Sequence, residues 1–178
     1  MKAEKAKALE SLRHHGGTHP DSAHPDSRRG FLGRLREFDG GLDEANFHGV
    51  MHALNVWAGE LRQGSQVDRQ VIAALWSICH LGRELGVDPG GMLRRDGRIT
   101  PDQVRTLKGW IRDISWASLA LLEGHEPETA FGDYQGPTAP ERAAVKPEMN
   151  KAWHARNRLP TGATLAAKAR WHGRHAKA

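Results

Sequence analysis

The sequence contains almost no cysteine and no long run of apolar residues. Cys79 is the single cysteine in 178 residues, which excludes a disulfide framework within one chain and a zinc site built from cysteines. No apolar run approaches the roughly 20 residues that a helix needs to span a bilayer. The opening residues, MKAEKAKALESLRHH, lack the apolar segment of a secretory signal. We therefore expect a soluble, cytoplasmic protein of bacterial type that does not bind a membrane.

Apolar residues are also scarce overall, and charge is unevenly distributed. Hydrophobic residues make up 38% of the chain, below the usual share of a globular domain, so we expect part of the chain to contribute little to a core. Residues 141–178 hold nine basic and two acidic side chains, whereas residues 28–124 hold thirteen and twelve. Such a basic segment favours contact with an anionic partner, although a merely solvated end has the same composition.

Three longer stretches carry apolar residues at helical spacing, over residues 42–62, 67–86 and 101–123. A shorter basic amphipathic stretch covers residues 28–38. No stretch alternates as a half-buried strand would. The sequence therefore predicts an all-α fold, a compact bundle of three long helices plus one short helix.

Capping residues define where these helices begin. Asp43 can cap the first long helix, Asp68 or Ser65 can cap the second, and Thr100, followed by Pro101 and Gln103, has the pattern of a capping box. In the second long helix, apolar residues that include Trp76 and Cys79 cover more than half of the circumference, which predicts a buried middle helix. Cys79 is then a small core side chain rather than a nucleophile.

The two ends of the chain differ from this bundle. Residues 1–27 are expected to form a short polar helix that buries little, followed by a flexible linker with four histidines between positions 14 and 24. A His-rich tract can bind metal, but the composition of residues 15–27 favours a linker. Residues 28–124 would form the bundle. Residues 125–178 are predicted to be a Pro-rich basic arm, attached to the bundle by Phe131 and Tyr134.

A candidate metal site lies on the first long helix. Glu44, His48 and His52 are spaced by four and share one stripe of the helix. Two histidines at this spacing can reach one ion, as in the zincin motif, but Gly49 stands where that motif has its glutamate. His80 on the second helix is the candidate for a further ligand. Zinc is the only cofactor that the sequence suggests; the alternative is that these side chains form a polar shoulder of the helix.

A second candidate site is a repeated unit in the basic arm. Trp153-His154-Ala155-Arg156 and Trp171-His172-Gly173-Arg174 share the pattern Trp-His-x-Arg. Aromatic rings beside basic groups can stack on bases while neutralising phosphates, or they can anchor short helices on a protein surface. The candidate contact residues are Trp153, His154, Arg156, Arg158, Lys168, Arg170, Trp171, His172 and Arg174.

The last segment, NRLPTGATLAAKARWHGRHAKA, is similar to the ending of small uncharacterised bacterial proteins. Those endings run through Pro, Thr-Leu and Trp-His-x-x-His toward a Cys-rich finish. The similarity covers about an eighth of the chain and implies no activity. The cysteines that would bind a metal in such an ending are missing here.

Three functions remain open from the sequence. The leading hypothesis is a non-enzymatic helical interaction protein whose basic arm binds a protein partner and folds as it binds. The first alternative is a nucleic-acid-binding accessory protein that uses the Trp-His-x-Arg units. The second is a metal-binding bundle that uses Glu44, His48, His52 and His80.

Overall fold

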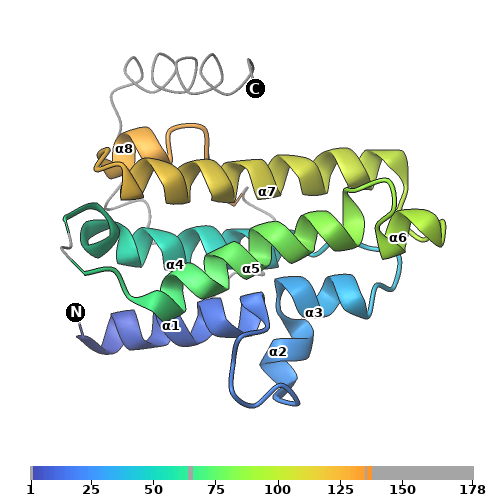
Figure 1. Cartoon of the computed structure of the whole chain (residues 1–178), viewed down its shortest axis with the longest axis horizontal. Helices are drawn as coiled ribbons and strands as arrows, with labels where there is room; N and C mark the ends of the chain where they lie inside the picture. The colour runs from blue at the N-terminus through green and yellow to red at the C-terminus, as the bar shows by residue number, and fades with distance from the viewer. Residues whose placement is uncertain (1, 64–65, 135, 138–178) are drawn as a thin grey trace.

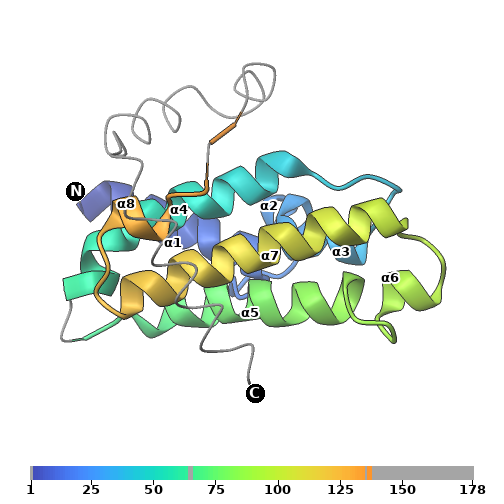
Figure 2. The same ribbon diagram turned by 90° about the horizontal axis from the view of Figure 1, so that it is seen from above.

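The computed structural model describes residues 2–63, 66–134 and 136–137, and these residues form helices and connecting turns without a strand. Four long helices lie side by side, and four short helices connect or flank them (Figures 1 and 2). The all-α prediction is confirmed, but the described residues form four long helices rather than the predicted three. The long helices are α1 (Lys2–Gly16), α4 (Glu44–Gln63), α5 (Arg69–Gly86) and α7 (Pro101–Leu122). The short ones are α2 (Pro25–Arg29), α3 (Phe31–Arg36), α6 (Met92–Arg95) and α8 (Pro127–Ala130).

The predicted helix starts are found where polar side chains bind free backbone N–H groups. At α7, the Thr100 hydroxyl accepts from the Gln103 N–H at 3.3 Å and the Gln103 side chain accepts from the Thr100 N–H at 2.9 Å. This is the reciprocal capping box that the sequence indicates. At α5, the Asp68 carboxylate accepts from the Gln70 N–H at 2.7 Å. These caps fix the N-termini of two of the long helices.

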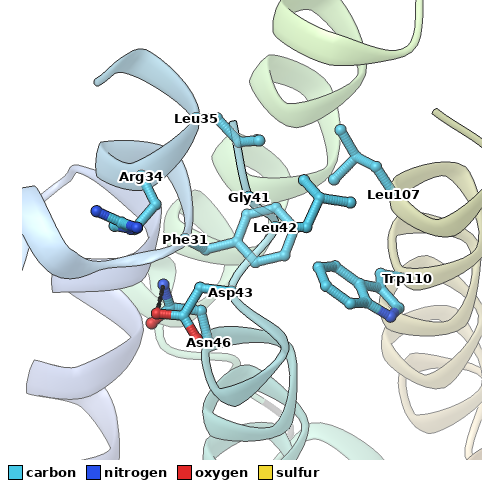
Figure 3. Close-up of a pocket in the computed structure, with 9 residues that line it drawn as sticks. All are labelled: Phe31, Arg34, Leu35, Gly41, Leu42, Asp43, Asn46, Leu107 and Trp110. Atoms are coloured by element: carbon cyan, nitrogen blue, oxygen red, sulfur yellow. Dashed lines mark hydrogen bonds between the residues drawn. The ribbon is translucent and has the colours of Figure 1, made fainter. Parts of the chain in front are cut away.

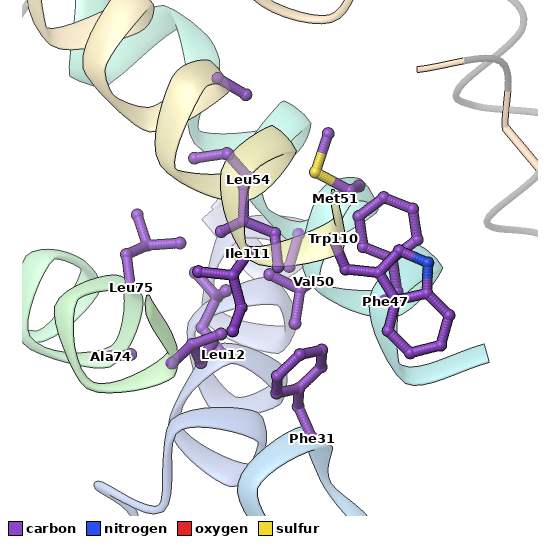
Figure 4. Packing of buried hydrophobic residues seen from close by; sticks show 14 of the residues in the cluster. Leu12, Phe31, Phe47, Val50, Met51, Leu54, Ala74, Leu75, Trp110 and Ile111 are labelled. Atoms are coloured by element: carbon purple, nitrogen blue, oxygen red, sulfur yellow. The ribbon is translucent and has the colours of Figure 1, made fainter. Parts of the chain in front are cut away.

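Helix α1 belongs to the bundle, and the expectation that it buries little was wrong. Leu12 is completely buried and Ala8 nearly so, because α1 packs against both α4 and α5. Figure 4 shows Leu12 among side chains of the other long helices. A polar helix with few large apolar residues thus contributes to the core, since one fully enclosed leucine is worth about 1.5–3 kcal/mol of apolar burial.

The predicted short helix over residues 28–38 is in fact two helices, and the break falls at Gly30. Gly30 has an extended backbone with φ −67° and ψ 171°, and it ends α2 and precedes α3. A Cβ at Gly30 would lie 2.5 Å from the carbonyl oxygen of His14. Glycine is required there because the backbones of α1 and of the α2–α3 corner approach so closely.

The segment between α1 and α2, interpreted from sequence as a flexible linker, is closed by local hydrogen bonds. The Thr18 N–H donates to the Arg13 carbonyl at 3.0 Å, and the His24 N–H donates to the Asp21 carbonyl at 3.3 Å. Both helices that it joins pack on each other. The segment therefore forms a turn within the bundle, which brings residues on either side of it together.

An aromatic cluster closes one side of the core. The rings of Phe47 and Trp110 stack with centroids 5.4 Å apart and 6° between their planes, and Phe31 meets Trp110 edge-on at 6.4 Å (Figure 4). Trp110 and Trp116 are buried, and so are Phe131 and Tyr134 beyond α7. Offset and edge-on pairs of this kind add about 0.5–1.5 kcal/mol each to the burial of their area.

Trp76 is the residue that differs most from the prediction of a buried helix over residues 67–86. It is 62% exposed, because the buried residues of α5, Val71, Ala74, Leu75 and Ile78, lie on the opposite side of the helix from it. Helix α5 is therefore amphipathic and one-sided rather than enclosed on most of its circumference. None of the helices in the described part of the chain has the length and apolar character needed to cross a bilayer.

Candidate functional site

The predicted metal stripe on α4 is divided between the core and the surface. His48 is buried, and its Nδ1 lies 2.7 Å from the Tyr134 hydroxyl in a hydrogen bond that joins residues 86 positions apart. Its Nε2 lies 3.9 Å from the Glu44 carboxylate. The hydrogen bond between His48 Nδ1 and Tyr134 thus helps to hold the segment after α8 against α4.

His80, the ligand expected from a second helix, lies elsewhere. Its ring stacks on Trp76 with centroids 4.4 Å apart and 21° between the planes, on the exposed side of α5. Among the described residues, groups of three potential ligands within 4.8 Å of one another form at two places, and neither includes Glu44, His48, His52 or His80. The structure therefore does not bring the predicted stripe together with His80 as one ligand set.

The candidate contact residues of the basic arm lie outside the described residues. They are Trp153, His154, Arg156, Arg158, Lys168, Arg170, Trp171, His172 and Arg174. Their assignment rests on the sequence alone.

The two groups of potential metal ligands lie at the C-terminal end of α1. One contains Glu10, His14 and His19, and the other contains His14, His24 and Asp26. The three imidazoles contact one another: His14 stacks on His19 at 4.1 Å and on His24 at 4.6 Å, and the rings of His19 and His24 are 5.6 Å apart and tilted. We refer to these five residues as the N-terminal histidine cluster. It gathers four donors from α1 and from the turn that follows, together with Asp26 of α2.

His14 is the central member of the N-terminal histidine cluster, and its surroundings keep it neutral. It is 7% exposed, and its Nδ1 lies 2.9 Å from the Ser27 hydroxyl. Burial lowers the pKa of His14, and the neighbouring imidazoles of His19 and His24 lower it further. A neutral imidazole is the form that binds metal ions.

His15 has a structural role next to this cluster. Its Nδ1 accepts the backbone N–H of Phe31 at 3.1 Å, and burial lowers the pKa of His15 to about 4. Its ring lies over Gly49 of α4. His15 therefore joins α1, the start of α3 and α4 as an uncharged acceptor.

Hollows on the molecule differ in size and character. The one between α3 and the start of α4 holds about 10 Å³, roughly the space of one water molecule, and Phe31, Leu42 and Trp110 nearly fill it (Figure 3). A larger hollow of about 390 Å³ lies beside the N-terminal histidine cluster, with Glu10, His14 and Asp26 in its wall. This second hollow gives solvent and small ions access to the cluster.

A third hollow, of about 480 Å³, lies beside Trp76. Its wall includes Val67, Arg69, Ile72 and Ala73. We refer to Val67, Arg69, Ile72, Ala73, Trp76 and His80 as the Trp76 surface. It combines an exposed indole with an apolar depression and a basic group, a combination found at protein contact sites.

Cys79 is not placed for nucleophilic chemistry. Burial raises the pKa of the Cys79 thiol to about 12, and nearby Arg83 opposes this only in part. The thiolate is therefore scarce at neutral pH. The side chain is partly buried and packs against the core, rather than lying within it as predicted.

Comparisons with models of protein families, with curated proteins and with solved structures found no match to this chain. Sequence reasoning missed the exposure of Trp76 and the gathering of the N-terminal histidine cluster. The signal for the cluster was present in the spacing, since His14, His19 and His24 are five residues apart and Glu10 lies one helical turn before His14.

Proposed function

We propose that the protein is a helical interaction protein that binds a protein partner with the Trp76 surface and with the basic residues 141–178. The single observation that carries the proposal is the exposed indole of Trp76. A tryptophan with 62% of its surface in water loses a large amount of apolar hydration when a partner covers it. Tryptophan is also among the residues most enriched where interface binding energy is concentrated.

The chemistry of the Trp76 surface indicates what kind of partner it fits. The hollow beside the indole is mostly apolar, and Arg69 is among the residues that line it. Residues 141–178 add nine basic side chains against two acidic ones. The partner that complements these features carries an apolar side chain for the hollow, surrounded by acidic residues. The apolar contact would supply most of the affinity, and the charges would accelerate encounter and select the partner.

Co-purification with matched variants tests this function. The tagged full chain, a Trp76→Ser variant and a Leu122→Ser variant are recovered from cells of the source organism, and the bound proteins are quantified. Leu122 is a suitable control because it is a large apolar side chain that is 44% exposed on another helix, α7. Both changes are at exposed positions, so both variants should fold.

We expect at least one protein to be recovered equally with the parent chain and with Leu122→Ser. The recovered amount of that protein should fall about tenfold or more with Trp76→Ser, because the loss of one hot-spot side chain has an effect of this size. Neutralising Arg156, Arg158, Arg170 and Arg174 should reduce the same protein. A set of bound proteins that is identical for Trp76→Ser and the parent would contradict the proposal.

Nucleic-acid binding is a second candidate, favoured by the repeated Trp-His-x-Arg units. Each unit pairs an indole with two basic side chains, which suits stacking on bases and contact with phosphates. Binding of the full chain to generic RNA and DNA at two salt concentrations tests it. Phosphate contacts release counterions, so affinity should fall steeply with salt and should be lost in a Trp153→Ala/Trp171→Ala variant. Weak binding that salt does not change would contradict it.

A further inference from the structure

The N-terminal histidine cluster has the ingredients of a metal centre, a function separate from partner binding. Glu10 and His14 are one turn apart on α1, and His19 returns to them from the turn after that helix. One potential ligand atom from each of the three lies within 4.8 Å of those of the other two. We propose that Glu10, His14 and His19 bind a divalent transition-metal ion, with Zn²⁺ as the best-fitting ion.

Both imidazoles have an oxygen to which Nδ1 can donate. His14 Nδ1 faces the Ser27 hydroxyl at 2.9 Å. His19 Nδ1 lies 3.1 Å from the Asp21 carbonyl oxygen and 3.2 Å from the Asp21 backbone N–H, so it can donate to the first or accept from the second. In the tautomer with the proton on Nδ1, each ring donates to its oxygen and keeps the Nε2 lone pair for a metal ion. Metal-binding histidines are held in this tautomer by such an oxygen.

The donor set fits zinc. Two imidazoles and one carboxylate are the three protein ligands of several zinc sites, in which water takes the fourth position. The hollow of about 390 Å³ has Glu10 and His14 in its wall, so water can reach that position.

The other group of ligands, His14, His24 and Asp26, is less suited to the ion. His24 caps α2, and its Nδ1 accepts the Asp26 N–H at 3.2 Å. That bond favours the tautomer of His24 with its proton on Nε2, whereas His19 Nδ1 also has the Asp21 carbonyl oxygen at 3.1 Å to donate to. His24 instead stacks on His14 at 4.6 Å, and it supports the site from the side.

Metal binding should rearrange the cluster in a detectable way. Zinc–nitrogen bonds of about 2.0–2.1 Å place two ligand nitrogens about 3.3 Å apart, closer than the limit of 4.8 Å within which the donors lie. The rings of His14 and His19 are nearly parallel, with 25° between their planes, whereas ligands of a tetrahedral ion point at it from different directions. The rings must therefore turn out of their stack when zinc binds.

Zinc titration of the full chain, with removal of adventitious metal beforehand, tests the site. Equilibrium dialysis should give about one tightly bound equivalent per chain, and the NMR signals of the imidazole nitrogens of His14 and His19 should shift. Glu10→Gln and His19→Ala, both at positions that are not fully buried, should weaken zinc affinity by about a hundredfold or more. Ser27→Ala should weaken it by about 10–100-fold, as other changes around metal ligands do.

Two further variants distinguish this site from the other histidines. His80→Ala removes an exposed histidine of α5, and it should bind zinc as the parent does. The double variant His48→Ala/His52→Ala tests the stripe on α4, and it should also still bind one equivalent of zinc per chain. The assignment would be overturned if the parent took up no zinc, or if Glu10→Gln and His19→Ala took up as much zinc as the parent. It would also be overturned if zinc binding were lost only in the His48→Ala/His52→Ala variant, or were lost in His24→Ala but not in His19→Ala.

Discussion

The imidazole of His15 occupies the space that a side chain at Gly49 would need. A Cβ on Gly49 would lie 2.8 Å from His15 Nε2, closer than carbon and nitrogen approach without displacement. The ring cannot move away easily, because its Nδ1 accepts the Phe31 N–H at 3.1 Å. The glycine between His48 and His52, at the position where a zincin carries its glutamate, is thus explained by packing between α1 and α4.

Gly49→Ala should therefore lower the free energy of unfolding, although alanine is the better helix former. The added methyl group forces His15 or the two helices apart, and overpacking of this kind costs about 1–3 kcal/mol. Urea unfolding followed by circular dichroism measures the change.

Gly59→Ala on the same helix is the matched control. Nothing lies within 4 Å of a Cβ at Gly59, which is exposed near the end of α4. Only helix propensity acts there, so this change should stabilise the protein by up to about 1 kcal/mol. Equal effects of the two substitutions would contradict the packing role of Gly49.

Stability should decrease as the pH falls from about 6.5 to about 4. Burial lowers the pKa of His15 from 6.5 to about 4 in the folded protein, whereas the unfolded chain binds this proton near pH 6.5. The stabilisation is complete above pH 6.5 and is lost as acid is added, by up to about 3 kcal/mol from this one group. Thermal unfolding at a series of pH values measures it.

His15→Gln should flatten this pH dependence, since glutamine offers an acceptor that does not titrate. The lowered pKa of His14 acts in the same direction, so part of the slope should remain. His80→Gln, which changes an exposed histidine, should leave the slope unchanged. A His15→Gln slope as steep as that of the parent would show that another group is responsible.

Tyr134→Phe should destabilise the protein by about 1–3 kcal/mol. The substitution removes the hydroxyl that bonds His48 Nδ1 at 2.7 Å in a buried site, and a buried polar group that loses such a partner carries a cost of this size. A double-mutant cycle with His48→Ala isolates the contact, and it should give a coupling energy of about 0.5–3 kcal/mol. Additive effects would mean that the bond contributes nothing to stability.

Cys79 should resist thiol reagents in the folded protein. With the pKa of its thiol raised to about 12 by burial, the reactive thiolate is rare at pH 8. Labelling with a disulfide reagent should be about a hundredfold slower than for the same thiol in concentrated urea. A native rate within a few-fold of the unfolded rate would place the thiol in solvent.

The fold could be predicted where local signals decide it, and not where distant residues meet. Capping groups such as Thr100 and Asp68 act within one helical turn, so the starts of α7 and α5 could be predicted from the sequence. The burial of Leu12 could not be predicted, because one leucine in a polar helix does not indicate that the helix packs against both α4 and α5. The need for glycine at position 30 depends on the His14 carbonyl, 16 residues away.

The candidate sites show the same division. Helical spacing placed Glu44 and His48 on one stripe correctly, but it could not show that Tyr134 would approach His48. Trp76 was grouped with core residues because its helix is rich in apolar side chains, whereas α5 has one packed side. The spacing of His14, His19 and His24 was a signal for the N-terminal histidine cluster, but the cluster forms only because a turn folds His19 and His24 back onto His14.

Site-specific photo-cross-linking in cells tests the central claim, that the Trp76 surface binds a protein partner. A photoreactive phenylalanine analogue replaces Trp76 in one full chain and Leu122 in another. The account predicts a discrete cross-linked protein for position 76, absent from position 122 and competed by excess parent chain. No adduct at position 76, or the same adducts at both positions, would contradict it.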